Sequence, residues 1–124
     1  MVRPDLPDRP GLRLVVLPDR PPALRLLWEQ SRLPRLAARH RLDLLHSPHY
    51  TRPLRLPCKS VVTLHDMTFF LFPELHTLPK RYFFRWMIRY SAGRSDALLS
   101  VSESTRQDAI RMLGVVPGRI HTTL

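Results

Sequence analysis

The chain has 124 residues, 44% of them hydrophobic, which suits one small domain with an apolar core and excludes wholesale disorder. Twenty Lys and Arg residues against ten Asp and Glu residues give a formal net charge of +10. Nucleic acids and anionic membranes are therefore candidate binding partners. A single cysteine excludes an internal disulfide, and four dispersed glycines exclude a glycine-rich phosphate loop.

The first third of the chain is predicted to start irregularly and then form a strand and helices. Residues 1–11 are rich in Pro and charge, and we expect them to be irregular, whereas the apolar run 12–17 is expected to form a strand. Residues 23–40 carry apolar side chains at helical spacing, and Pro34 should divide them into two short helices. Residues 42–46 then have the pattern of a short buried strand.

The remainder of the chain continues to alternate strands with helices. A helix that starts at Ser102 or Ser104 should follow the third of the later apolar runs. Ser104 with Gln107 fits a capping box, and Gly114 fits the stop after that helix. The expected elements are a strand at 60–65, a helix at 78–93 with Pro79 near its start, a strand at 96–101, a helix to residue 112 and a strand from 119.

This alternation predicts an α/β, Rossmann-like domain over residues 12–124, with a parallel sheet that is buried on both faces. In such sheets ligands bind beyond the carboxyl ends of the strands. Polar residues follow three of the predicted strands at that position, and they are the candidate site: His49, Tyr50, His65, Asp66, Ser102 and Glu103.

The adjacent pair His65 and Asp66 is the strongest candidate for chemistry. A neutral imidazole just past a strand can donate a hydrogen bond to a sugar hydroxyl or to developing negative charge, and a carboxylate can accept hydroxyl protons. The competing interpretation is structural, with Asp66 capping a turn and His65 bonded to backbone. The pattern leaves both interpretations open.

Metal and nucleophilic chemistry have weaker support in the sequence. His46 and His49, together with Cys58 and the His65–Asp66 pair, form only a loose scatter of metal-ligating types, so we expect no metal site. Cys58 follows a proline in a predicted loop without an evident partner, and no nucleophile elbow is present.

The predicted helix at 78–93 carries an unusual surface pattern. At 100° per residue, Arg81, Arg85 and Arg89 form one basic stripe. The opposite, apolar face is expected to carry Phe83, Trp86, Met87 and Tyr90. One interpretation is a contact with an anionic membrane or an acidic partner. The other is an ordinary surface helix that packs its aromatic face on the sheet and solvates its arginines.

Four segments, in this order, resemble the N-terminal domain of the retaining glycosyltransferases of family 4, which have the two-domain GT-B fold. The resemblance spans residues 12–124, and some of its features are similar to mannosyltransferases. The segments are DLLHSPHY at 43–50, VVTLHDM at 61–67, FPE at 72–74 and ALLSVSESTRQD at 97–108.

The resemblance implies transfer of a sugar from a nucleotide-sugar, such as a GDP- or UDP-sugar, to a sugar or lipid-linked acceptor. It implies that His65 contacts the donor sugar, with Asp66 beside it, and that Ser102 and Glu103 border the cleft. His49 and Tyr50 would lie in an acceptor-side loop. Some relatives rest on membranes through a basic, aromatic-rich region, which is compatible with the Arg81, Arg85 and Arg89 stripe.

The chain departs from the family pattern because it contains no counterpart of the glycine-rich first loop or of the C-terminal donor domain. We therefore expect a fragment that binds no cofactor by itself and is inactive alone. The alternatives are a basic α/β module for nucleic acid, which no nucleic-acid motif supports, and a vestigial remnant without activity. The absence of a signal peptide or an apolar span predicts a cytoplasmic protein, either free or peripheral on the membrane.

Overall fold

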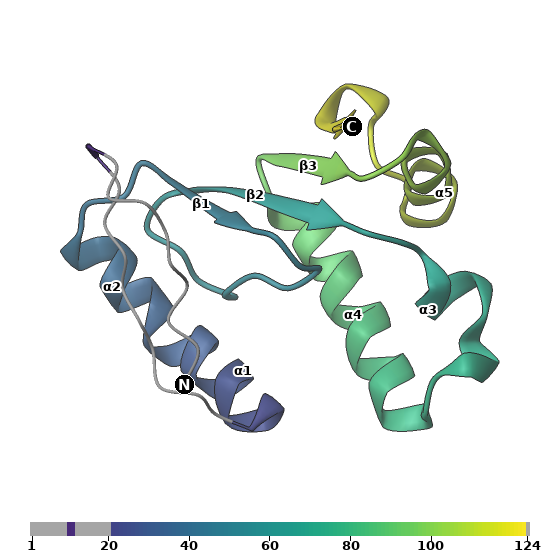
Figure 1. Cartoon of the computed structure of the whole chain (residues 1–124), viewed down its shortest axis with the longest axis horizontal. Coiled ribbons are helices and arrows are strands. Elements are labelled where there is room, and N and C mark those ends of the chain that lie inside the picture. The colour runs from purple at the N-terminus through teal and green to yellow at the C-terminus, as the bar shows by residue number, and fades with distance from the viewer. Residues whose placement is uncertain (1–9, 12–20, 124) are drawn as a thin grey trace.

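Four parallel strands form a single sheet in the order β1-β2-β3-β4 (Figure 1). The computed structural model describes residues 10–11 and 21–123, so the strand predicted at 12–17 lies outside the described residues. The parallel order with helices beside it confirms the predicted α/β, Rossmann-like class. The strands are β1 (Leu44–Ser47), β2 (Lys59–Leu64), β3 (Ala97–Ser100) and β4 (Ile120–Thr122).

The helices lie largely where hydrophobic periodicity places them. The predicted break at Pro34 is confirmed, because the first helical segment divides at Arg32. Two short pieces before α4, namely α3 and η1, follow no periodicity long enough to predict. The elements are α1 (Pro22–Ser31), α2 (Leu33–Arg39), α3 (Thr68–Leu71), η1 (Pro73–Leu75), α4 (Leu78–Arg94), α5 (Glu103–Leu113) and η2 (Pro117–Arg119).

The core lies between one face of the sheet and the helices. Val62, Leu98 and Ile120 sit opposite one another on β2, β3 and β4 and are at most 1% exposed. Ile88 of α4 and Ala109 of α5 join them in one buried cluster. In Figure 1, α1, α2 and α4 lie below the strands, on one side of the sheet.

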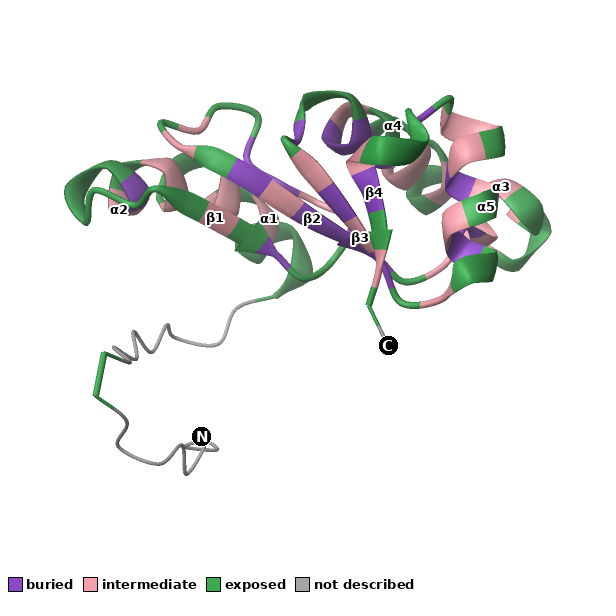
Figure 2. Cartoon of the chain, turned by 90° about the horizontal axis from the view of Figure 1, so that it is seen from above, coloured by how far each residue is buried: buried purple, intermediate pink, exposed green. Residues whose placement is uncertain are grey.

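The other face of the sheet is not closed by the described residues, which corrects the prediction of a sheet buried on both faces. Val61 and Leu99 on that face are half-buried, and His46 and His121 are exposed. Seen from above in Figure 2, exposed residues alternate along β1 with less exposed ones. Strand β1 is therefore not the buried strand expected at 42–46, and Leu44 within it is 51% exposed.

Helix α4 buries a stripe that matches the predicted one only in part. Met87 of the predicted apolar face is buried, whereas Trp86 is 51% exposed and was wrongly placed on the packing face. Ile88, which was not placed on that face, is 0% exposed. The arginines Arg85 and Arg89 lie over the ring of Phe70, with 5.1 and 4.7 Å from each guanidinium carbon to the ring centroid. The real packing stripe therefore lies between the basic stripe and the aromatic stripe.

The N-cap of α5 shows which of the two predicted starting residues, Ser102 or Ser104, is correct. The Ser102 hydroxyl accepts a hydrogen bond from the Thr105 amide at 3.1 Å, so Ser102 is the N-cap and the Ser104–Gln107 capping box is wrong. Gly114 ends the helix at φ 66°, a left-handed conformation that glycine adopts without strain, as predicted.

Candidate functional site

The carboxyl ends of β1 and β2 bring His49, Tyr50 and His65 together. The ring centroids of His49 and His65 are 5.5 Å apart, and those of Tyr50 and His65 are 5.9 Å apart. Parallel strands make this possible because their carboxyl ends meet at the same edge of the sheet. The sequence prediction that these two loops share one edge is confirmed.

His65 is held by a backbone group of the neighbouring loop. Its Nε2 lies 2.7 Å from the carbonyl oxygen of Pro48. A carbonyl can only accept, so Nε2 carries the hydrogen and, in the neutral ring, Nδ1 is the acceptor. The side chain is exposed, and its own carbonyl accepts from the Thr105 hydroxyl at 3.1 Å. The loop at Pro48 and Thr105 of α5 therefore hold His65 at the carboxyl edge of the sheet.

Asp66 stabilises the turn that follows β2. Its Oδ1 accepts from the amide of Thr68 at 2.9 Å and from the Thr68 hydroxyl at 2.7 Å. Burial raises the pKa of Asp66, but the hydrogen bonds from Thr68 and the nearby hydroxyl of Tyr50 outweigh burial, so its pKa lies below the ordinary value. Thr68 was not predicted, although an Asp two residues before a Thr is a recognisable turn signal.

Tyr50 is part of the core rather than of the open surface. It is 4% exposed and makes edge contacts with Phe69 and Phe84, at centroid distances of 6.1 and 6.4 Å. Burial, and secondly the carboxylate of Asp66, raise the pKa of Tyr50. His49 is exposed, and burial of part of its ring together with the charges of His65 and Arg25 lowers its pKa.

Ser102 and Glu103 lie at the carboxyl end of β3, the next strand along the same edge. The Ser102 hydroxyl is used by the helix cap, and it also donates to the Thr105 hydroxyl at 3.0 Å. Glu103 is exposed and accepts from Gln107 at 2.7 Å and from Thr122 of β4 at 3.0 Å. Hydrogen bonds from Gln107, Thr122 and Arg106 lower the pKa of Glu103, so it presents a carboxylate at neutral pH.

The loop that carries His49 and Tyr50 is fastened to helices on both sides. Gln30 of α1 donates through Nε2 to the Arg52 carbonyl at 3.1 Å and accepts through Oε1 from the Leu54 amide at 2.8 Å. The hydroxyl of Tyr90 on α4 donates to the Leu54 carbonyl at 2.7 Å. Nothing in the sequence identifies Gln30 as a loop clamp, because its partners are backbone groups 22 and 24 residues away.

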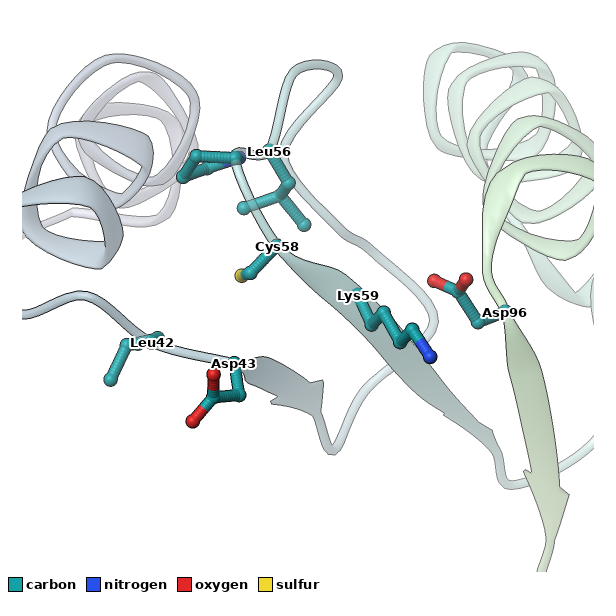
Figure 3. Close-up of a pocket in the computed structure, with 7 residues that line it drawn as sticks. Leu42, Asp43, Leu56, Cys58, Lys59 and Asp96 are labelled. Carbon is teal, nitrogen blue, oxygen red and sulfur yellow. The ribbon is translucent and has the colours of Figure 1, made fainter.

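An open hollow of about 450 Å³ lies at the opposite, amino-terminal edge of the sheet (Figure 3). Its lining includes Asp43, Cys58, Lys59 and Asp96. Asp96 already accepts from the Ser60 amide at 2.8 Å, and the lining mixes both signs of charge. This arrangement selects neither a cation nor an anion. Within residues 10–11 and 21–123, no group of three or more His, Cys, Asp or Glu side chains could hold a metal ion.

The family model for Glycosyltransferase Family 4 matches residues 2–123 of this chain. The chain belongs to glycosyltransferase family 4. It is also similar to the O-antigen chain mannosyltransferase B of Escherichia coli, with 31% identity over 78 residues. That match covers 63% of this chain and 20% of the relative, so the chain spans about a fifth of that relative's length. The motifs quoted from the sequence thus identified the family correctly.

No helix in the described part of the chain is both long enough and apolar enough to cross a membrane.

Proposed function

We propose that this chain is the acceptor-side part of a glycosyltransferase that moves a hexosyl group, with mannosyl the first candidate, from a GDP- or UDP-sugar. Family membership and the similarity to a mannosyltransferase support this assignment. The observation that carries it is the position of His65, exposed at the carboxyl edge and held there by Pro48 and Thr105.

The hydrogen bond to Pro48 supports a specific role for His65 in this proposal. Because Nε2 is committed to the Pro48 carbonyl, Nδ1 is the atom left for the sugar. In the neutral ring Nδ1 accepts a hydrogen bond from a sugar hydroxyl, and it donates only when the ring is protonated. Asp66 acts as a positioning residue, since its carboxylate holds the turn through Thr68.

The remaining residues of the edge would shape the acceptor side. His49 and Glu103 are exposed and offer an imidazole and a carboxylate to hydroxyl groups. Tyr50 and Ser102 support the edge, the first from the core and the second from the helix cap. We propose that retention of the anomeric configuration and donor binding require residues outside this chain, and that the chain alone transfers no sugar.

A chimeric enzyme tests this function. The chain replaces the matching stretch of the E. coli mannosyltransferase, and transfer from a nucleotide-mannose is measured with His65→Ala and with the exposed His121→Ala as a matched control. We expect His65→Ala to lower kcat by about 10²-fold or more with retained folding, and His121→Ala to have little effect. Equal activity of the two variants would contradict the role of His65.

We further propose that α4 rests on an anionic membrane surface. Its exposed aromatic stripe supports this, because Tyr82 is 67% exposed and Trp86 is 51% exposed and stacked on Tyr90, with 5.7 Å between centroids. Tyr and Trp favour the membrane interface, and the adjacent Arg81, Arg85 and Arg89 would attract anionic lipid.

Co-sedimentation with vesicles tests this contact. We expect binding to phosphatidylglycerol vesicles but not to phosphatidylcholine vesicles, and a several-fold loss on Trp86→Ala. Phe72→Ala is the matched control, because Phe72 is 50% exposed but lies outside α4. Equal binding of both variants to anionic vesicles would contradict the proposal for α4.

A further inference from the structure

Arg52 is a buried charge in the loop that carries His49 and Tyr50. The residue is 6% exposed, and its Nε is buried without a hydrogen-bond partner. A buried guanidinium is costly unless it is paired, since the charge loses its hydration. Arg52 therefore carries a buried donor without a partner, and an anion is the kind of group that suits it.

The described residues do not supply that anion. The two ion pairs found among them both lie on α5, namely Arg106 with Glu103 and Arg111 with Asp108. Glu29 of α1 lies against the same loop, but its carboxylate accepts from the Thr51 hydroxyl at 3.1 Å, and burial raises its pKa. Glu29 is thus bound to Thr51, and the described residues contain no ion pair between Glu29 and Arg52.

The backbone of the loop around Arg52 is held by its neighbours. The Arg52 carbonyl is bound by Gln30, and two residues later Leu54 is bound by both Gln30 and Tyr90. The flanking Pro53 is fully buried. An incoming anion would therefore not have to order this backbone first.

The shape of the guanidinium indicates which anion suits Arg52. A guanidinium fork matches the paired oxygens of a phosphate.

We propose that Arg52 forms a phosphate subsite on the acceptor side of this domain. The subsite takes a phosphate or diphosphate group of the acceptor, so the acceptor is a phosphorylated molecule rather than a neutral glycan. The assignment of the phosphate to the acceptor rests on the proposed function, whereas phosphate binding at Arg52 does not depend on it.

Thermal unfolding of the 124-residue chain, with and without inorganic pyrophosphate at constant ionic strength, tests the subsite. Arg52→Met is compared with Arg55→Met, which removes an exposed arginine from the same loop. Without pyrophosphate, we expect Arg52→Met to unfold at or above the temperature of the unchanged chain, because a buried donor without a partner is removed. Pyrophosphate should raise the melting temperature of the unchanged chain and of Arg55→Met by roughly 4 °C or more, and leave Arg52→Met unshifted.

Three results would overturn the proposal. A large drop in melting temperature, or failure to fold, on Arg52→Met would show that a structural counter-ion already pairs with Arg52. An equal pyrophosphate shift in Arg52→Met would place the anion elsewhere. An equal shift with acetate would mean a carboxylate subsite and not a phosphate subsite. Arg52→Lys should fold and show a smaller pyrophosphate shift than the unchanged chain, because lysine keeps the charge without the fork.

None of these outcomes involves sugar transfer. If pyrophosphate does not bind at Arg52, the proposed transferase function is unaffected. If the transferase function is wrong, phosphate binding by Arg52 is still tested by the melting temperatures.

Discussion

The imidazole of His65 is tied to the carbonyl of Pro48, with 2.7 Å between Nε2 and the carbonyl oxygen. This contact joins the turn after β2 to the loop after β1, so it links the two halves of the candidate site directly. It also selects the tautomer of the neutral ring, with the hydrogen on Nε2. The bonding of His65 to backbone, first considered as an alternative to function, engages Nε2 and leaves Nδ1 as the ring nitrogen that the proposed function assigns to the sugar.

The tautomer of His65 can be measured directly. We expect nitrogen NMR of the ring to show protonated Nε2 and unprotonated Nδ1 in the neutral form, because only an N–H can bond to the Pro48 carbonyl. His121, which is exposed on β4, serves as the reference for an unconstrained ring. The opposite tautomer at His65 would contradict the proposed acceptor role of Nδ1.

Asp66→Asn should change the pH dependence of stability. The folded pKa of Asp66 is lowered, so its contribution is present above the unfolded pKa of about 3.9 and is lost as the pH falls through the folded pKa. We expect Asp66→Asn to lower the free energy of unfolding by about 1 kcal/mol at pH 7.

Urea unfolding at neutral pH and again well below the unfolded pKa provides the check. The gap between Asp66→Asn and the unchanged chain should shrink in acid, because protonation makes Asp66 neutral as well. Asp43→Asn, at an exposed position outside the strands, is the control. A gap that grows in acid would show that the sign assigned to Asp66 is wrong.

Substitutions of Ser102 and Ser104 show which of the two serines caps α5. Ser102→Ala should lower the free energy of unfolding by about 1 kcal/mol, because the Thr105 amide loses its acceptor. Ser104 is exposed within α5, so Ser104→Ala should change stability by less than about 0.5 kcal/mol. Chemical denaturation of both variants measures the difference, and the reverse order would restore the Ser104 capping box.

Ile88 and Trp86 test which face of α4 packs on the sheet. Ile88 is 0% exposed in the core, so Ile88→Ala should cost about 2–5 kcal/mol. Trp86 is half exposed, and Trp86→Ala should cost clearly less although it removes a larger side chain. Unfolding curves of the two variants compare the faces. A greater loss for Trp86→Ala would favour the face expected from the sequence.

The buried face of α4 could not be predicted from the residue pattern alone. Helical spacing correctly gives the helix and its basic stripe, but aromatic and aliphatic residues surround the remaining surface, so the pattern does not single out the buried stripe. Packing decides it, because Ile88 meets β2 and β3 while Phe70 of α3 meets Arg85 and Arg89. Helix α3 has only four residues, too few to show a period.

The sequence allowed the position of the candidate site to be predicted, but not the hydrogen bonds that its residues make. Parallel topology places the residues after β1 and β2 at one edge, so the closeness of His49 and His65 follows from the sequence. The contacts of His65 with Pro48 and Thr105 span 17 and 40 residues. Each involves a backbone carbonyl, which every residue type has, so the sequence does not reveal these contacts. The burial of Arg52 is hidden for the same reason, because a proline-rich basic loop suggests an exposed segment.

The central claim is that the carboxyl edge around His65 binds the sugar substrates, and a ligand titration followed by backbone NMR tests it most directly. Adding a mannose-terminated oligosaccharide phosphate to the chain should shift the amide signals of His49, His65 and Glu103. The signals of Asp43, Cys58 and Asp96 at the amino-terminal hollow should stay in place. Shifts confined to that hollow, or no saturable shift at the carboxyl edge, would contradict the account.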